Sequence, residues 1–327
     1  MAFPQTLQAS DIPYKFKHKL MYANRKDLHR RFRMGKEIVV REAKPEDKEA
    51  VLSFCQKTWE WGDYIPKVWD RWIKDPAGKI FVGIIDGKPV GITNVIIVKE
   101  GEAWLRGART HPDYRRRGVI TAITLKCLEF AVKKGAKLAR LVTESTNIPA
   151  QKALEKLGFK PIAKFIWWET ENFETKPSKY SSFAKIDDLE QIWRYLEKSE
   201  CFRRCHGLYA KLYIWISLEK ETLRSFIENN KCIKAEVDGE ILGLTLIDDE
   251  VSREWQESSI QVCYIDGNFE AVADMLKFLK KFCKEKEVNK IYAVSSDHPT
   301  MIRVFEHLGF KREEVEEIVY EKVLTKL

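Results

Sequence analysis

The sequence contains no run of about 18 consecutive apolar residues, so we expect no membrane-spanning segment. It also lacks an apolar leader followed by a small-residue cleavage site, which argues against export. Its seven cysteines are odd in number and widely scattered, a pattern unlike that of a disulfide framework. These absences predict a cytoplasmic protein that makes no contact with a membrane.

A broad excess of positive charge is missing from most of the chain, although the net charge is +8. Residues 1–36 hold nine Lys or Arg against two acidic residues, which leaves a charge of +1 for residues 37–327. A nearly neutral body does not provide the basic face that binds nucleic acid. We therefore expect no nucleic-acid partner, and we interpret residues 1–36 as a basic extension, with Met1, Met21 or Met34 as the start of the protein.

The chain has enough apolar material for more than one core. Hydrophobic residues make up 44% and charged residues 32% of its 327 positions, which excludes a disordered or collagen-like chain. A single core stops growing at roughly 250–300 residues, so two domains are the expectation.

The two halves of the chain resemble each other. An Asp-Gly turn between two β-rich runs occurs at Asp86 and again 152 positions later. A Leu-Gly-Phe-Lys sequence that ends a helical pattern occurs at Leu157 and again 151 positions later. A third match, Ala43 with Ala184, has an offset of 141, which places about eleven extra residues in the second half between its first helix and its hairpin. The common order indicates a diverged tandem repeat.

Both halves show the same predicted order of elements, which is typical of an α/β chain of the α+β type. Each half is expected to form a mixed, mostly antiparallel sheet flanked by helices. The predicted units are a basic extension (1–36), a first domain (37–170), a linker (171–180) and a second domain (181–327). The elements predicted for the first domain are Glu37–Glu42, Pro45–Lys57, Ile80–Ile85, Val90–Val98, Ala103–Thr110, Val119–Lys134, Leu138–Thr143, Pro149–Leu157 and Phe159–Glu169.

The segment from His111 to Ile120 joins a β-rich run to a helix and carries three consecutive arginines. A helix that begins at Gly118 or Val119 leaves its first N–H groups without internal partners, and together with the helix dipole these groups attract an anion. Successive N–H groups in the turn would surround a pyrophosphate, and glycine at position 118 would let the backbone approach it closely. The segment predicts a phosphate-binding turn, and a solvated basic loop is the alternative.

This segment resembles the acetyl-CoA loop of the GNAT acetyltransferase superfamily, written Gln/Arg-x-x-Gly-x-Gly/Ala. Downstream, Asn147 with Ala150 looks like the family's Asn-x-x-Ala, and Gly158-Phe159 looks like its final Gly-Phe. The resemblance is strong over residues 37–170 and weak over residues 181–325, and it implies two tandem GNAT-like domains with acetyl-CoA as co-substrate. The cofactor contacts that it implies are Arg109, Thr110, Arg115, Arg116, Arg117, Gly118, Val119, Ile120 and Asn147.

Several positions depart from the family's pattern. Ile120 stands where the loop has its last Gly or Ala, and Leu154 stands where the family often has a tyrosine that protonates the leaving thiolate. In the second half the loop is replaced by Asp266, Gly267, Asn268 and Phe269. We expect the second domain to be degenerate, without cofactor binding, and to cover or shape the site of the first.

The resemblance implies acetyl transfer to an amine, which must lose a proton before it attacks. Glu144, at the end of a predicted strand, is the first candidate for the base and Glu102 the second, and a surface carboxylate is the alternative for each. Backbone N–H groups near Arg109 and Thr110 would hold the thioester oxygen as it becomes an oxyanion.

The predicted acceptor-binding residues are Asp63, Tyr64 and Arg106. Asp63 would bind a cationic group, and Arg106 and Arg109 would bind a carboxylate. A free amino acid carries groups of both charges and would suit such a pocket. Asp63 lies in the sequence Trp-Glu-Trp-Gly-Asp-Tyr, from Trp59 to Tyr64, which resembles the histidine N-acetyltransferase-like branch of the superfamily. Trp69 and Trp72 are three positions apart, as on one helix face, and a core stripe is the alternative reading of that pair.

The sequence therefore predicts an acetyl-CoA-dependent N-acetyltransferase for a small-molecule amine, acting as a monomer or homodimer. No metal is expected, because Cys201, Cys205 and His206 lack the second pair of ligands that would complete a tetrahedral site. Two alternatives remain open at this point: an enzyme that acetylates protein N-termini or lysines, and a non-catalytic acetyl-CoA sensor.

Overall fold

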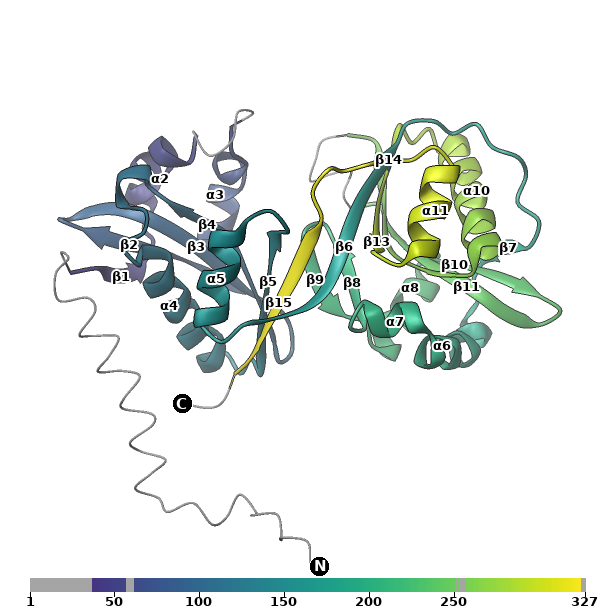
Figure 1. Cartoon of the computed structure of the whole chain (residues 1–327), viewed down its shortest axis with the longest axis horizontal. Helices are drawn as coiled ribbons and strands as arrows, with labels where there is room; N and C mark the ends of the chain where they lie inside the picture. The colour runs from purple at the N-terminus through teal and green to yellow at the C-terminus, as the bar shows by residue number, and fades with distance from the viewer. Residues whose placement is uncertain (1–36, 57–61, 251, 253–256, 325–327) are drawn as a thin grey trace, which may run out of the picture.

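The computed structural model describes residues 37–56, 62–250, 252 and 257–324, which form two lobes joined by long strands (Figure 1). The basic extension, the three candidate start methionines, Trp59 and Trp61 lie outside the described residues. Within them, the elements predicted for the first half are present, with bounds that differ by two residues or fewer.

The first repeat begins with a strand and two helices, continues with three consecutive strands, and ends with alternating helices and strands. Its strands are β1 (Val39–Glu42), β2 (Gly78–Ile85), β3 (Lys88–Lys99), β4 (Glu102–Thr110), β5 (Leu138–Glu144) and β6 (Lys160–Thr170). Its helices are α2 (Lys48–Cys55), α3 (Ile65–Lys74), α4 (Val119–Lys133) and α5 (Ile148–Lys156), with 3-10 turns η1 (Pro45–Asp47) and η2 (Pro112–Tyr114).

The second repeat follows the same order and adds elements after its first helix. Its strands are β7 (Ser181–Phe183), β8 (Leu208–Lys211), β9 (Ile214–Ser217), β10 (Cys232–Val237), β11 (Glu240–Asp248), β12 (Ser259–Gly267), β13 (Lys290–Ser296), β14 (Lys311–Arg312) and β15 (Glu317–Val323). Its helices are α6 (Leu189–Lys198), α7 (Glu200–Arg204), α8 (Lys220–Glu228), α10 (Phe269–Glu285) and α11 (Pro299–His307), with the 3-10 turn η3 (Ile186–Asp188). The extra residues predicted between the first helix and the hairpin are confirmed, and they include α7 and the β8–β9 hairpin.

The described strands form one 13-stranded sheet and the separate β8–β9 hairpin. The order across the sheet is β1-β2-β3-β4-β5-β15-β6-β13-β12-β11-β10-β7, with β14 paired to β6. Among these neighbours, β4–β5 and β12–β13 are parallel and the others antiparallel. The predicted mixed, mostly antiparallel sheet is therefore confirmed, but as one continuous sheet.

The two repeats exchange their last strands. Strand β15 lies between β5 and β6, where Glu317–Val323 pairs with Leu138–Glu144. Strand β6 pairs in turn with β13 of the second repeat. Each repeat thus completes its part of the sheet with a strand of the other, so the predicted boundaries at 170 and 181 follow the order of the repeats along the chain but do not divide the sheet.

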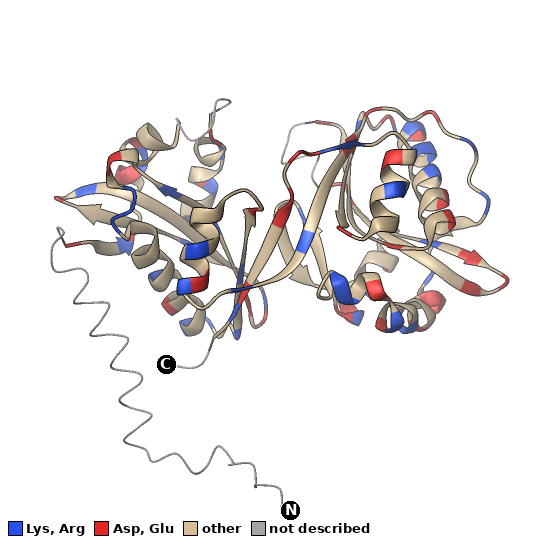
Figure 2. Ribbon diagram, in the orientation of Figure 1, with Lys and Arg blue, Asp and Glu red and all other residues tan. Residues whose placement is uncertain are grey.

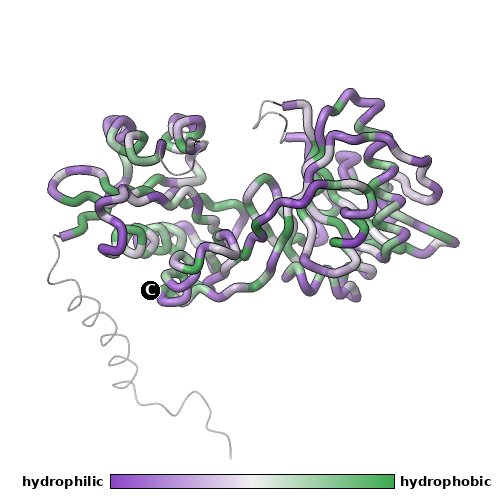
Figure 3. The backbone as a smooth tube through the Cα atoms, turned by 45° about the horizontal axis from the view of Figure 1, so that its top comes forward, coloured by the Kyte–Doolittle hydropathy of each residue, from purple (hydrophilic) through white to green (hydrophobic). Residues whose placement is uncertain are grey.

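Helices cover the first repeat's part of the sheet on both faces. Helix α4 packs on one face, against β2, β3 and β4, and helices α2 and α3 pack on the other. On the face of α2 and α3, Trp215 of β9 joins Trp104 and Phe165 in one apolar cluster that continues into the second repeat. The hydrophobic stretches follow the strands through both lobes, and the peripheral loops are hydrophilic (Figure 3).

Charged side chains of both signs are interspersed over both lobes (Figure 2). All seven cysteines are free and buried. No helix in the part of the chain that the structure describes is long and apolar enough to cross a membrane. In the same part, no group of three or more His, Cys, Asp or Glu side chains is placed to hold a metal ion.

Candidate active site

The parallel strands β4 and β5 are hydrogen-bonded at one end and open at the other. Their register joins Glu102 to Leu138 and ends where Trp104 meets Arg140. Beyond that point β4 continues to Thr110 and β5 to Glu144 without pairing to each other. Backbone N–H and C=O groups on the facing edges are therefore left without strand partners, and an extended ligand inserted between the strands would satisfy them.

A β-bulge redirects β4 at the start of this open region. Ile92 pairs with Arg109 and Asn94 with Arg106, so two residues of β4 oppose one of β3. Gly107, within the bulge, has a φ of 68°, and a Cβ atom there would lie 2.8 Å from Trp72 Cζ3. Glycine is required at this position both for the left-handed backbone and for the close approach of α3.

The turn from β4 to α4 has a left-handed backbone at two positions and leads directly into the helix. Arg116 and Gly118 have φ values of 60° and 83°, and α4 begins directly after Gly118. The Ala122 N–H donates to the Gly118 carbonyl at 3.0 Å, so the N–H groups that precede Ala122 in the helix have no acceptor within it. The predicted strand–turn–helix arrangement is confirmed, and Arg115, Arg116 and Arg117 are exposed on its surface.

The start of α4 is held close to the sheet by two glycines. A Cβ atom at Gly91 of β3 would lie 2.5 Å from Val119 Cγ1, and one at Gly83 of β2 would lie 3.0 Å from the same atom. Val119 is buried, and Ile120 packs against the core cluster beneath α4. Ile120 therefore contributes to the apolar core, which accounts for its bulk at a position where the family has Gly or Ala.

The downstream residues Asn147 and Leu154 both make contacts that support the fold. Asn147 is the N-cap of α5, and its side-chain oxygen accepts a hydrogen bond from the Ala150 N–H at 3.2 Å. Asn147 is exposed and follows directly on the open end of β5. Leu154 is buried in the cluster under α4 and provides no proton donor.

The predicted role of Asp63 as a substrate contact is wrong. Its side chain is fully buried (0% exposed), and its two oxygens accept hydrogen bonds from Arg109 at 2.7 and 3.4 Å. One of these oxygens also accepts the Ile65 N–H at 3.0 Å at the start of α3. The Arg109 guanidinium lies 5.3 Å from the centre of the Tyr64 ring. Asp63, Tyr64 and Arg109 thus fasten α3 to the bulged strand instead of facing an acceptor.

The two tryptophans of α3 are core residues, which is the alternative interpretation of their spacing. Trp69 and Trp72 are 1% and 2% exposed. Arg106 lies over the Trp72 ring at 4.4 Å, and its Nε donates to Asn94 Oδ1 at 2.8 Å. Arg106 is half-buried on the same side of the sheet as α3, so it keeps its place as a candidate contact for an acceptor.

The two predicted base candidates lie at opposite ends of the open strands. Glu102 is buried at the paired end, where it accepts hydrogen bonds from Arg140 at 2.8 Å and from the Ser217 N–H at 3.2 Å. Glu321 of β15 binds the same arginine at 2.8 Å. Glu102 is thus held in a buried ion-pair network and lies away from the opening. Glu144, in contrast, is exposed at the open end of β5.

Glu317 is a residue that the sequence analysis did not single out. Strand exchange places it beside Glu144, in register across β5 and β15. Its Oε2 atom is buried without a hydrogen-bond partner. Burial, with a smaller contribution from the negative charge of Glu144, raises the pKa of Glu317 to about 7. No local sequence signal marks Glu317, because its surroundings come from strands distant in the chain.

The equivalent opening of the second repeat is filled by its own side chains. Strands β12 and β13 are paired as far as Val262 and Ala293, and then separate. Between them, the Cys201 thiol of α7 lies 3.7 Å from the Ile265 carbonyl oxygen and 3.4 Å from Ser296 Oγ. A cavity of about 360 Å³ lies next to the Cys201 side chain, which forms part of its wall.

The connection that corresponds to the Arg115–Gly118 turn is short in the second repeat. Strand β12 ends at Gly267, and the side chain of the next residue, Asn268, caps α10 by accepting the Ala271 N–H at 2.8 Å. Asp266 accepts hydrogen bonds from Ser199, Tyr195 and Tyr264. This repeat offers a buried acid where the first repeat offers exposed arginines.

Residues 48–159 match the family model described as "Acetyltransferase (GNAT) family". Over 145 residues the chain is 29% identical to an uncharacterized N-acetyltransferase of Methanocaldococcus jannaschii, covering 39% of this chain and 63% of that protein. It is 33% identical over 92 residues to the N-acetylaspartate synthetase of Xenopus tropicalis, covering 28% of this chain and 34% of that protein. It is 25% identical over 126 residues to the histidine N-acetyltransferase of Oreochromis niloticus, covering 38% of this chain and 34% of that protein.

The matched segments thus span less than two thirds of the length of these curated relatives. The crystal structure of a GCN5-related N-acetyltransferase from Sphaerobacter thermophilus is similar over most of the chain, with a TM-score of 0.58 and 13% sequence identity. The likeness covers 88% of this chain and 96% of that one, so it extends over both repeats.

Proposed function

Because residues 48–159 match the GNAT acetyltransferase family model, we propose that the chain is a GNAT N-acetyltransferase that transfers an acetyl group from acetyl-CoA to the amine of a small molecule such as a free amino acid. One observation carries the proposal: strands β4 and β5 separate beside a turn that has a left-handed glycine and leads into the N-terminus of α4. The separated strands suit an extended pantetheine chain, and the turn suits its pyrophosphate.

The residues of the first repeat would divide the work between two groups of contacts. The N–H groups at the start of α4 and the side chains of Arg115, Arg116 and Arg117 would bind the pyrophosphate. The unpaired edge of β4 near Arg109 and Thr110 would offer backbone N–H groups to the thioester oxygen as negative charge develops on it. Asn147, at the end of β5, would border the same opening.

The small-molecule acceptor is supported by two kinds of observation. Two relatives are named for acetylated amino acids, one for histidine and one for N-acetylaspartate. In this chain, Arg106 and Glu144 supply opposite charges to the side of the sheet that carries α3, which suits a zwitterion. Free, buried thiols suit the reducing cytoplasm that we propose as its location.

A pair of glycine substitutions tests the donor site. Gly118 and Gly135 lie at opposite ends of α4 and have nearly equal φ values of 83° and 84°. Gly118→Trp should weaken acetyl-CoA binding in calorimetry by at least about tenfold, because the indole would occupy the space above the turn. Gly135→Trp imposes the same backbone strain far from the turn and should leave the affinity unchanged. Equal affinities in both variants would refute the proposed donor site.

A further inference from the structure

We propose that Glu317, which belongs to the second repeat, is the general base of the site in the first repeat. The inference rests on the proposed acetyl transfer and names the group that would take the proton from the acceptor amine. Strand exchange brings β15 next to β5, and Glu317 pairs with Glu144 at the point where β5 ends beside the opening. The second repeat would then complete the site instead of merely covering it.

Strand alternation decides which side of the sheet Glu317 faces. The register between β15 and β5 is continuous, so Glu317 lies on the same side as Val319 and Glu321. Glu321 binds Arg140, and Arg140 binds Glu102 of β4. Glu102 and Arg106 alternate onto one side of β4, and Arg106 stacks on Trp72 of α3. Glu317 therefore faces the side of the sheet on which we place the acceptor.

The carboxyl group of Glu317 differs from those of Glu102 and Glu321 on the same face in its hydrogen bonding. Its Oε2 atom is buried and lacks a hydrogen-bond partner, whereas Glu102 and Glu321 share Arg140. A buried polar atom without a partner destabilises the folded protein, so its presence calls for an explanation outside stability. An ammonium group of a bound acceptor would provide the missing partner.

The groups that face Glu317 keep its pKa in a useful range for a base. Glu144 of β5 faces it, and Tyr213 lies nearby, between β8 and β9. Burial raises the pKa of Tyr213, and the negative charge of Glu317 adds to that rise. The nearest cation on β6, Lys164, lies on the opposite side of the sheet, where it binds Glu316 at 2.9 Å. Burial and like charge thus act together, and a base of pKa about 7 takes protons effectively at neutral pH.

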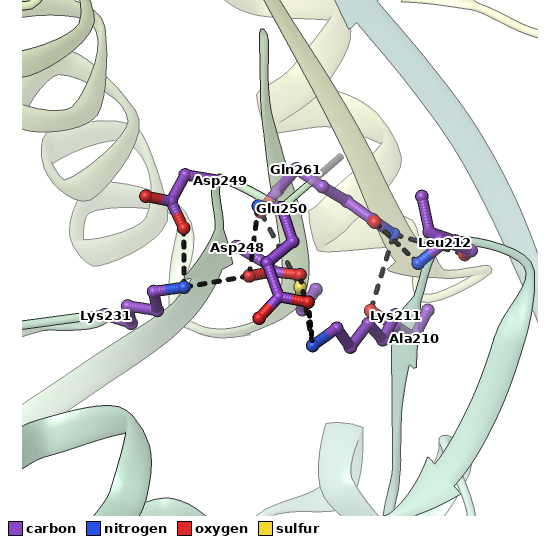
Figure 4. A network of polar contacts seen from close by, with 9 residues as sticks. Ala210, Lys211, Leu212, Lys231, Asp248, Asp249, Glu250 and Gln261 are labelled. Atoms are coloured by element: carbon purple, nitrogen blue, oxygen red, sulfur yellow. Dashed lines mark hydrogen bonds and ion pairs between the residues drawn. The ribbon is translucent and has the colours of Figure 1, made fainter. Parts of the chain in front are cut away.

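The β8–β9 hairpin of the second repeat forms a wall beside Glu317. Tyr213 lies at its turn and stacks on Trp167 of β6, with ring centres 4.5 Å apart, while half of its surface stays exposed. Gln261 of β12 fixes the turn, because its Oε1 accepts the Leu212 N–H at 2.8 Å and its Nε2 donates to the Leu212 carbonyl at 3.3 Å (Figure 4). A rigid aromatic wall next to the base would orient the acceptor.

The proposed step balances in protons and bonds. The Glu317 carboxylate accepts a proton from the acceptor's ammonium group, and the neutral amine attacks the thioester carbon. As the new C–N bond forms and the C–S bond breaks, the nitrogen's second proton passes to the leaving sulfur, which gives the amide and the free thiol of coenzyme A. Glu317 then releases its proton to water.

The test compares three variants in a pH–rate profile with acetyl-CoA and a panel of free amino acids and polyamines. Glu317→Gln should lower kcat by about a hundredfold or more, leave acetyl-CoA affinity unchanged and remove the rise in rate near pH 7. Glu144→Gln should move that rise to lower pH, because it removes a like charge beside Glu317. Glu316→Gln is the matched control. Glu316 directly precedes β15 and pairs with Lys164 and Arg312, so this variant should keep both the rate and the profile.

Two outcomes overturn the proposal, and they are distinguishable. If the wild type transfers acetyl groups and Glu317→Gln keeps its rate and pH profile, Glu317 is not the base while the proposed function stands. If the wild type binds acetyl-CoA but acetylates no amine in the panel, the proposed function fails and the base assignment fails with it.

Discussion

Replacing Glu317 with glutamine should stabilise the folded protein much more above pH 7 than at pH 5. The pKa of this carboxyl rises from 4.5 to about 7 in the folded protein, chiefly because it is buried. The folded protein then holds a proton that the unfolded chain loses between these two pH values. The free energy of unfolding therefore falls as the pH rises from 4.5 to 7, and the full loss persists above pH 7.

The size of the effect follows from the two pKa values. Each tenfold change in a dissociation constant corresponds to about 1.36 kcal/mol, so the loss has an upper bound of about 3 kcal/mol. Glutamine carries no charge and escapes this loss, although its amide also finds no partner at the buried position. We expect a net gain of about 1–3 kcal/mol at pH 8.

Urea unfolding at pH 5 and pH 8 measures this difference directly. Glu316→Gln serves as the control, because Glu316 is paired with Lys164 at 2.9 Å and its loss should change stability by about 1 kcal/mol or less, in the destabilising direction. A Glu317→Gln variant that is equally shifted at both pH values, or less stable than the wild type at pH 8, would refute the view that Glu317 is buried without a partner.

Three further predictions concern neighbouring contacts. Arg140→Met leaves the buried carboxylates of Glu102 and Glu321 without a cation and should lower the free energy of unfolding by about 3–5 kcal/mol in urea titrations; a loss below about 1 kcal/mol would contradict the network. Asp63→Asn should destabilise the protein by about 1–3 kcal/mol while acetyl-CoA affinity measured by calorimetry is retained. Tyr213→Ala should raise the KM for the acceptor and leave that for acetyl-CoA unchanged in steady-state assays, and the reverse pattern would place the hairpin at the donor.

The elements that sequence analysis predicted well are those encoded locally. Helix α4, with its left-handed Gly118 and apolar periodicity, was placed within one residue at each end. The Asp-Gly hairpins and the tandem repeat depend on short turns and on matching spacing, which a single chain displays directly. The turn from Arg115 to Gly118 belongs to the same class, because its arginines and glycine are consecutive, while its binding of phosphate stays a prediction.

What could not be predicted depends on pairing between distant segments. Alternation of side chains identifies β15 as a strand but does not choose its neighbours, so the exchange that brings Glu317 beside Glu144 has no local sign. Asp63 has the sequence of an exposed turn residue, but its partner, Arg109, lies 46 positions away. The sequence also could not reveal that Cys201 fills the second opening, since α7 reaches it from an inserted segment.

The central claim is that the first repeat transfers acetyl groups to a small amine, and the most direct measurement is mass spectrometry of the acceptor. The full chain is incubated with acetyl-CoA and the panel of free amino acids and polyamines, with short peptides added as competing acceptors. The account predicts that one small amine gains the mass of a single acetyl group and that Gly118→Trp abolishes this product. Acetylated peptides alone would assign the enzyme to protein substrates, and bound acetyl-CoA with no acetylated amine would contradict the claim and favour a sensor.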